Sequence, residues 1–157
     1  MKDLLLKFQT SLNFLTVIPA GGKTEKISQD ALAKSALFFP VVGILIGSLL
    51  YLFFFLVRNL FIPQITSFLI LTLWIYLTGS LHIDGFADTV DGISGGKNRQ
   101  EILEIMKDAH IGPKGVVAVC LLLLFKYFLI FSVLDSPRVK ILIYAPCAGR
   151  YAMVLAG

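Results

Sequence analysis

Charge is scarce in this sequence. Only 15% of the 157 residues are charged, whereas 57% are hydrophobic and the mean hydropathy is +0.83. A soluble domain carries about 25% charged residues. This composition therefore argues against a water-soluble fold and predicts a membrane protein, and the chain length predicts a single membrane domain, residues 1–157.

Cysteine and histidine are also rare. Cys120 and Cys147 each lie inside an apolar segment, and their spacing matches no zinc motif and gives no disulfide framework. We interpret both as small hydrophobic residues. His82 and His110 do not predict a zinc site, because a transition metal would need further nitrogen or sulfur ligands.

The sequence has no basic stripe interleaved with aromatic residues, so its net charge of +4 does not predict nucleic-acid binding. We do not expect the start of the sequence to be a secretory signal, because Lys2, Asp3 and Lys7 interrupt its apolar positions. Leucine and phenylalanine recur there at helical spacing. This spacing predicts an amphipathic helix that lies on the membrane surface or, alternatively, packs on the spans.

Long apolar runs are what the sequence has in abundance. They predict an all-α fold, a polytopic membrane helical bundle with spans at 36–57, 61–81, 116–134 and 141–157. Gly43 and Gly47 form a face on the first span that would let a neighbouring helix approach closely, or would permit a homo-oligomer. Pro146 and Arg150 break the fourth run.

The basic residues predict the orientation in the membrane. A polar stretch, residues 82–115, separates the second and third spans. On the side of this stretch and of the N-terminus lie Lys2, Lys7, Lys23, Lys26, Lys34, Lys97, Arg99, Lys107 and Lys114, and on the other side lie Arg58, Arg138 and Lys140. The positive-inside rule therefore places the N-terminus and the polar stretch in the cytoplasm.

Three carboxylates gather at the start of this polar stretch, in the sequence HIDGFADTVDG. Asp84, Asp88 and Asp91 are spaced i, i+4, i+7, which is one face of a helix. Like charges at that spacing repel, so the pattern predicts a cation between them.

Hard oxygen ligands favour Mg²⁺, Mn²⁺ or Ca²⁺ as this cation. The stretch lacks the alternate ligands of an EF-hand, so we favour Mg²⁺ bound through carboxylates and a substrate phosphate. The alternative is a solvated acidic loop, but carboxylates at a membrane edge are usually functional.

Basic residues near the cluster predict phosphate binding. Lys97, Arg99 and Lys107 follow it in the chain and would hold substrate phosphates. The nearby glycines at 92, 95 and 96 would leave backbone amides open to a phosphate.

Two further residues each have two interpretations. Asp108, at the end of a short amphipathic helix, is either a fourth metal ligand or a solvated helix end. Arg150, in an apolar segment, either meets a substrate phosphate or snorkels to the interface.

Five stretches of the sequence resemble the cobalamin synthase family, the adenosylcobinamide-GDP ribazoletransferases. They occur in the order of the family and cover nearly the whole chain. The stretches are FLTVIP at 14–19, FFPVVGILIG at 38–47, TGSLHIDGFADTVDG at 78–92, EIMKDAHIGPKG at 104–115 and GRYAMVL at 149–155.

The resemblance implies a Mg²⁺-dependent, multi-pass enzyme of the inner membrane. In such enzymes α-ribazole, or its 5′-phosphate, attacks the phosphoryl group that links cobinamide to GMP. GMP leaves, and adenosylcobalamin or its 5′-phosphate forms. The metal ions held by the aspartates would neutralise the pyrophosphate and stabilise the leaving GMP. His82 is counted with the basic residues as substrate-binding.

The catalytic residues are assigned by analogy with the CDP-alcohol phosphotransferases, which place aspartates at a membrane edge. By this analogy Asp91 accepts the proton of the ribazole 5′-hydroxyl, and Asp88 is the second catalytic carboxylate. The motif of those enzymes has Ala-Arg after Asp-Gly, whereas Phe86 and Ala87 stand here. Family members continue with further hydrophobic segments, so we expect this chain to be truncated at its C-terminus relative to them.

Three other functions remain open at the level of the sequence. A CDP-alcohol-type lipid synthase would use a similar acidic motif, but the spacing differs. A divalent-cation transporter would place its carboxylates within the spans rather than at their ends. A structural membrane subunit would tolerate Asp88→Asn without any loss beyond folding.

Overall fold

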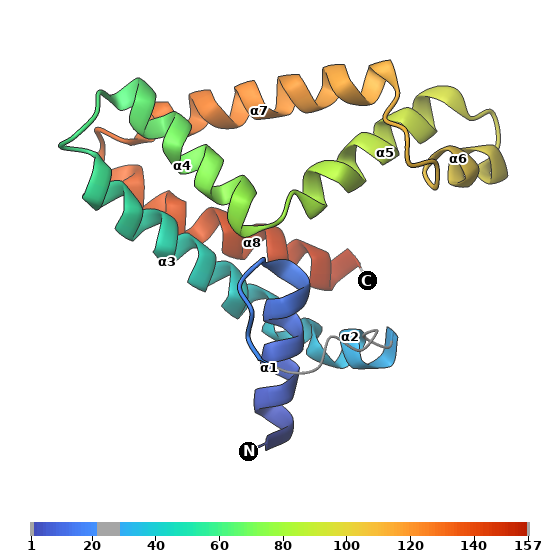
Figure 1. Cartoon of the computed structure of the whole chain (residues 1–157), viewed down its shortest axis with the longest axis horizontal. Helices are drawn as coiled ribbons and strands as arrows, with labels where there is room; N and C mark the ends of the chain where they lie inside the picture. The colour runs from blue at the N-terminus through green and yellow to red at the C-terminus, as the bar shows by residue number, and fades with distance from the viewer. Residues whose placement is uncertain (1, 22–28, 157) are drawn as a thin grey trace. The chain divides into compact units, whose positions relative to one another are not determined.

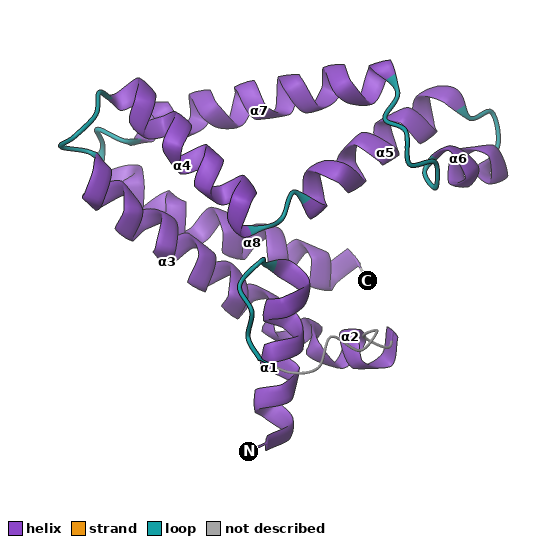
Figure 2. Ribbon diagram, in the orientation of Figure 1, coloured by secondary structure: helices purple, strands orange, loops and turns teal. Residues whose placement is uncertain are grey.

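The computed structural model describes residues 2–21 and 29–156, and every regular element in these ranges is helical (Figure 1, Figure 2). The fold class predicted from the apolar runs is therefore confirmed. The elements are α1 (Lys2–Leu15), α2 (Gln29–Ser35), η1 (Ala36–Phe38), α3 (Phe39–Val57), α4 (Pro63–Leu77), α5 (Leu81–Gly95), α6 (Arg99–Ile105), α7 (Pro113–Val133), η2 (Pro137–Lys140) and α8 (Ile141–Ala156).

The contacts divide the chain into two compact units. The α3–α8 unit contains residues 1–79 and 130–157, and the α5–α7 unit contains residues 80–129. The single membrane domain expected from the sequence stays a prediction.

Among the described residues, three helical stretches are each long and apolar enough to cross a membrane: Asp30–Val57, Pro113–Val133 and Pro137–Ala156. The first, third and fourth predicted spans match α3, α7 and α8 to within three residues, and Gly157 lies outside the described residues. Lys23 and Lys26, used in the charge count, also lie outside them.

The predicted second span is wrong in its extent. Helix α4 has 15 residues, fewer than the about 20 that a bilayer requires, so it would cross only together with α5 as a broken span. The helix ends because Gly79 (φ 58°) and Ser80 (φ 60°) both adopt left-handed backbone conformations. A serine in the left-handed region of backbone conformation is uncommon, and the pattern of apolar residues does not predict it.

Helices α3 and α8 pack against each other in antiparallel orientation (Figure 1). A Cβ on Gly43 would lie 2.6 Å from Cα of Cys147, and one on Gly47 would lie 2.6 Å from Cα of Ile143. The predicted role of these glycines in close helix packing is confirmed. Their face is filled by α8, and homo-oligomer formation stays a prediction.

Pro146 lies inside α8 and is fully buried beside Gly43. Pro146 and Arg150 interrupt the apolar run but not the helix, because α8 continues through both residues. A proline costs a helix one backbone hydrogen bond, and packing against neighbouring helices lets membrane helices tolerate it. Here the contact with α3 supplies that packing.

Helix α1 packs on α3 with its C-terminal half. Leu12 and Leu15 are buried, and the ring of Phe14 stacks on that of Phe39 with 5.9 Å between the ring centroids. The side chains of Leu4, Leu5 and Leu6 at the other end are exposed. This helix therefore packs on the first span over part of its length and presents an apolar surface elsewhere.

The FLTVIP segment follows α1 and contacts the end of α4. The backbone amide of Val17 donates to the carbonyl of Leu77 at 2.9 Å, and the hydroxyl of Thr16 turns back to Leu12. Val17 also approaches Gly79, where a Cβ would lie 3.2 Å from its side chain. These contacts tie the first sequence block to the break that precedes α5.

Candidate functional site

The acidic block forms one continuous helix, α5, which starts directly after the left-handed Ser80. The carbonyl of Ser80 accepts the amides of Ile83 and Asp84 at 2.9 and 3.0 Å. Asp84 therefore stands in the first turn, where the helix dipole favours a negative charge. The predicted helical face is confirmed for this segment.

Asp84 and Asp88 lie one turn apart on α5. The side chain of Asp84 is exposed and that of Asp88 is half-buried. Within residues 2–21 and 29–156, neither carboxylate makes a hydrogen bond or an ion pair. Both have their oxygen atoms available for a ligand.

Asp91 differs from these two because both of its carboxylate oxygens accept backbone hydrogen bonds. The amide of Gly112 donates to Oδ2 at 2.7 Å, and the amide of Gly115 donates to Oδ1 at 2.8 Å. Gly112 precedes α7 and Gly115 lies in its first turn. These amides belong to the unsatisfied donors at the start of a helix, so Asp91 caps α7 from α5.

Asp108 lies between α6 and α7 and pairs with His110. The ring nitrogen Nδ1 of His110 lies 2.8 Å from Oδ1 of Asp108, and the backbone amide of His110 donates to the same oxygen at 3.0 Å. These two hydrogen bonds, the side-chain one first, lower the pKa of the Asp108 carboxyl below its usual value. Both side chains are exposed, so a predicted metal ligand already has one oxygen engaged.

A pocket of about 410 Å³ opens in the α5–α7 unit between these groups. Asp91 and Asp108 both line it, together with His110 and Lys114. The ammonium group of Lys114 donates to the carbonyl of Ser94 at 2.8 Å, which joins the start of α7 to the end of α5 a second time.

Helix α6 is capped by the loop that carries Lys97, a predicted phosphate ligand, and Arg99 is the first residue of the helix. The side chain of Asn98 accepts the amides of Gln100 and Glu101 at 3.0 Å, and Glu101 accepts the amide of Lys97 at 2.8 Å. This pattern resembles a capping box, except that Glu101 accepts the amide of Lys97, one residue before the N-cap Asn98. The side chains of Lys97 and Arg99, like that of Lys107 after the helix, are exposed and so accessible to a phosphate.

The glycines at the end of α5 do not present open amides to a phosphate, so that expectation is wrong. A Cβ on Gly92 would lie 2.7 Å from Cγ of Met106, and one on Gly96 would lie 2.6 Å from the backbone nitrogen of Ile102. These glycines instead let α6 pack closely on α5. The amide of Gly96 is used by the carbonyl of Gly92.

Arg150 lies in the α3–α8 unit, on α8. Its side chain is only 4% exposed, and Nε and Nη2 are buried without a hydrogen-bond partner among the described residues. Of the two alternatives, snorkelling to the interface does not fit this burial. A buried guanidinium lacking a partner fits the expectation of an anion.

The predicted ligands do not form one tight cluster. Across the described ranges, with their gap at 22–28, no group of three or more His, Cys, Asp and Glu side chains is placed to hold a metal ion. Mg²⁺ often binds through one or two carboxylates and substrate phosphates. Asp84 and Asp88, with free oxygens on one face, fit that simpler arrangement. His82 is half-buried in the first turn of α5.

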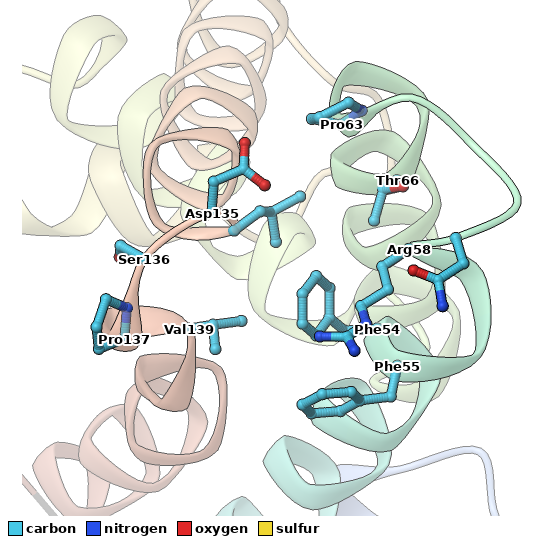
Figure 3. A pocket seen from close by; sticks show the side chains of 11 residues that line it. Phe54, Phe55, Arg58, Pro63, Thr66, Asp135, Ser136, Pro137 and Val139 are labelled. Atoms are coloured by element: carbon cyan, nitrogen blue, oxygen red, sulfur yellow. The ribbon is translucent and has the colours of Figure 1, made fainter.

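The pocket in Figure 3 lies elsewhere, in the α3–α8 unit, and has a volume of about 450 Å³. The guanidinium carbon of Arg58 lies 4.5 Å from the ring centroid of Phe55, and Asp135 lies on another wall (Figure 3). None of the site residues predicted from the sequence lines this pocket. Asp135 therefore offers a carboxylate control outside the candidate site.

The sequence did not predict a role in the site for three residues that join α7 to α5, namely Gly112, Lys114 and Gly115. The only signal was the GPKG pattern, which predicts the end of one helix and the start of another. That signal says nothing about which carboxylate accepts the amides.

The comparisons with known proteins agree on one family. The family model described as Cobalamin-5-phosphate synthase matches residues 7–157. An adenosylcobinamide-GDP ribazoletransferase of Acetivibrio thermocellus is 40% identical over 88% of this chain and 56% of its own length. One of Caldanaerobacter subterraneus subsp. tengcongensis is 35% identical over 99% of this chain and 61% of its own length.

The chain thus spans 56% and 61% of the lengths of these two curated relatives. No solved structure matches it significantly. The matched region contains both blocks that Asp91 joins, HIDGFADTVDG and DAHIGPKG. The chain belongs to the cobalamin-5-phosphate synthase family.

Proposed function

We propose that the chain acts in an adenosylcobinamide-GDP ribazoletransferase, as the names of its relatives indicate for them. The substrates would be adenosylcobinamide-GDP and α-ribazole or its 5′-phosphate. The observation that carries the proposal is the free pair of carboxylates, Asp84 and Asp88, on one face of α5 within the family's acidic block.

The reaction is a phosphoryl-group transfer. The 5′-oxygen of the ribazole forms a bond to the phosphorus that carries cobinamide, and the bond from that phosphorus to GMP breaks. The proton of the 5′-hydroxyl passes to a carboxylate of α5. Asp84 and Asp88 would hold Mg²⁺, which supplies charge neutralisation at the pyrophosphate.

The chain's cations would orient the substrate. The exposed side chains of Lys97, Arg99 and Lys107 are free to contact phosphate oxygens through charge-assisted hydrogen bonds. Arg150 would bind a further anionic group of the substrate. His82, in the first turn of α5, would also contact the substrate. The roles of Asp91 as base and of Asp108 as metal ligand stay predictions.

The protein would act in the inner membrane. The apolar helices make it a multi-pass membrane protein, and the basic residues would place the N-terminus and α5 on the cytoplasmic side. Nucleotides and free Mg²⁺ are available there.

The test is GMP release from adenosylcobinamide-GDP in proteoliposomes. The chain is compared with an extended chain that carries the additional segment of a full-length relative, each with and without α-ribazole and with Mg²⁺ or EDTA. We expect release that requires both α-ribazole and Mg²⁺. A folded extended chain that releases no GMP but conducts divalent cations would overturn the proposal in favour of a transporter.

A further inference from the structure

Asp91 makes contacts that distinguish it from the other two aspartates of α5. It is half-buried, and each of its oxygens accepts one backbone amide, from Gly112 and from Gly115, at 2.7 and 2.8 Å. Asp84 and Asp88 accept no hydrogen bond in the described part of the chain. The three carboxylates share a helical face but not an environment.

The two glycines are required for this contact. A Cβ on Gly112 would lie 2.6 Å from Oδ1 of Asp91, and one on Gly115 would lie 2.9 Å from its Cγ. Real side chains do not approach so closely, so any residue larger than glycine would displace either the Asp91 carboxylate or the start of α7 and break the contact. The GPKG turn is thus shaped to receive the carboxylate.

Each oxygen of Asp91 already accepts one backbone amide, so a carboxylate that moved toward a substrate hydroxyl would leave an amide without its partner. An unpaired amide at a half-buried helix start costs free energy. The contacts therefore hold the carboxylate in place.

The same contact sets the wall of the 410 Å³ pocket. His110 lies two residues before Gly112 and Lys114 lies between the two glycines, and both line the pocket with Asp91. The bond from Lys114 to the carbonyl of Ser94 secures this wall to α5 from its other side. Loss of the Asp91 contact would displace these two basic side chains relative to α5.

We propose that Asp91 is a positioning residue, which holds the start of α7 and with it His110 and Lys114 against α5. Asp84 and Asp88 are then the α5 carboxylates that meet metal and substrate. This inference rests on the proposed function for its catalytic meaning, but the contact itself is testable without activity.

The first measurement is hydrogen exchange of the backbone amides of residues 112–116 in nanodiscs. Asp91→Asn has nearly the same shape and offers only one acceptor oxygen, so we expect exchange to become about 10- to 100-fold faster there, as loss of a hydrogen bond to a charged group predicts. Exchange in α3 and α8 should not change. Gly85→Ala, at a glycine with open space around it, is the matched control for a change on α5. Unchanged exchange in Asp91→Asn would overturn the inference.

The second measurement compares turnover and Mg²⁺ requirement in the GMP-release assay. Gly115→Ala keeps the carboxylate but blocks the contact, so it should reproduce the loss of turnover in Asp91→Asn. The double variant should be no worse than either single variant, and the half-saturating Mg²⁺ concentration should stay that of the unmodified protein.

Two results would contradict the positioning role. One is a loss of turnover in Asp91→Asn that exceeds that in Gly115→Ala by 100-fold or more, which is the size expected for removal of a base. The other is a raised Mg²⁺ requirement in Asp91→Asn, which would make Asp91 a metal ligand. Absence of GMP release from the unmodified protein would sink the proposed function while leaving the exchange result intact.

Discussion

The amide of Gly115 lies 2.8 Å from Oδ1 of Asp91, although the two residues are 24 positions apart in the chain. The contact joins the HIDGFADTVDG block to the DAHIGPKG block, so the two form one structural unit. The intervening helix α6 packs on α5 through Gly92 and Gly96. The acidic face of α5 is thus supported by the polar stretch that follows it.

The first prediction concerns the packing of α3 on α8. A Cβ on Gly47 would overlap the backbone of Leu142 and Ile143, so Gly47→Ala should lower the free energy of unfolding by about 1–3 kcal/mol, as overpacking generally does. The measurement is thermal unfolding of the purified chain in detergent.

Gly149→Ala is the matched control for this prediction. Gly149 lies on the same helix, α8, but no heavy atom lies within 4 Å of the position of its Cβ. Alanine favours a helix over glycine by about 1 kcal/mol, so this variant should be neutral or slightly more stable. Equal destabilisation by both substitutions would contradict the packing account.

The sequence predicts the helices well where long apolar runs define them. The bounds of α3, α7 and α8 follow from composition because about 20 apolar residues have few alternatives in a bilayer. The break at Gly79 and Ser80 does not follow from composition, because hydropathy carries no information about the left-handed backbone of a serine. The polar helix α2 was not predicted for a related reason, because seven residues carry too little periodicity.

The candidate site could be predicted only in part. The i, i+4, i+7 spacing correctly places Asp84, Asp88 and Asp91 on one helix. It cannot reveal that Asp91 accepts two amides, because backbone donors are the same in every sequence. The burial of Arg150 was likewise undetermined, since it depends on how α8 packs rather than on the residues beside it.

The second prediction concerns pH. Hydrogen bonds from His110 lower the pKa of Asp108 in the folded chain, below the ordinary aspartate value of about 3.9. Ionised Asp108 therefore contributes stability that is fully present above that ordinary value, and the contribution is lost as the pH falls through the lower folded-state pKa. Solvent exposure keeps the contribution small.

The direct check is a carboxyl titration of Asp108 by ¹³C NMR. His110→Ala removes the ring hydrogen bond, so the pKa of Asp108 should rise toward the ordinary value. His82→Ala serves as the control histidine, because His82 lies on α5 and the histidine that bonds Asp108 is His110. A pKa for Asp108 that is the same with and without His110 would show that the pair does not form in solution.

The third prediction concerns Arg150. Its guanidinium is buried with two nitrogens lacking partners, so replacement by an apolar side chain of similar length should not destabilise the fold. For Arg150→Met we expect an unchanged or higher Tm. We also expect a KM for adenosylcobinamide-GDP about 10- to 100-fold higher, since a hydrogen bond to a charged group is lost.

The control is Arg138→Met, which removes an exposed cation of the same unit. It should change neither Tm nor KM. If Arg150→Met instead lowers the Tm without a change in KM, the guanidinium has a structural role and does not bind substrate.

The measurement that tests the central claim most directly is Mg²⁺-dependent GMP release by Asp84→Asn and Asp88→Asn in the extended chain. Each variant should lose at least about 100-fold in turnover, as expected when a group that stabilises transition-state charge is removed, and should need more Mg²⁺. Asp135→Asn, which changes a carboxylate in the other unit, should keep full activity. Full activity of Asp84→Asn and Asp88→Asn would show that the acidic face of α5 is not the site of the reaction.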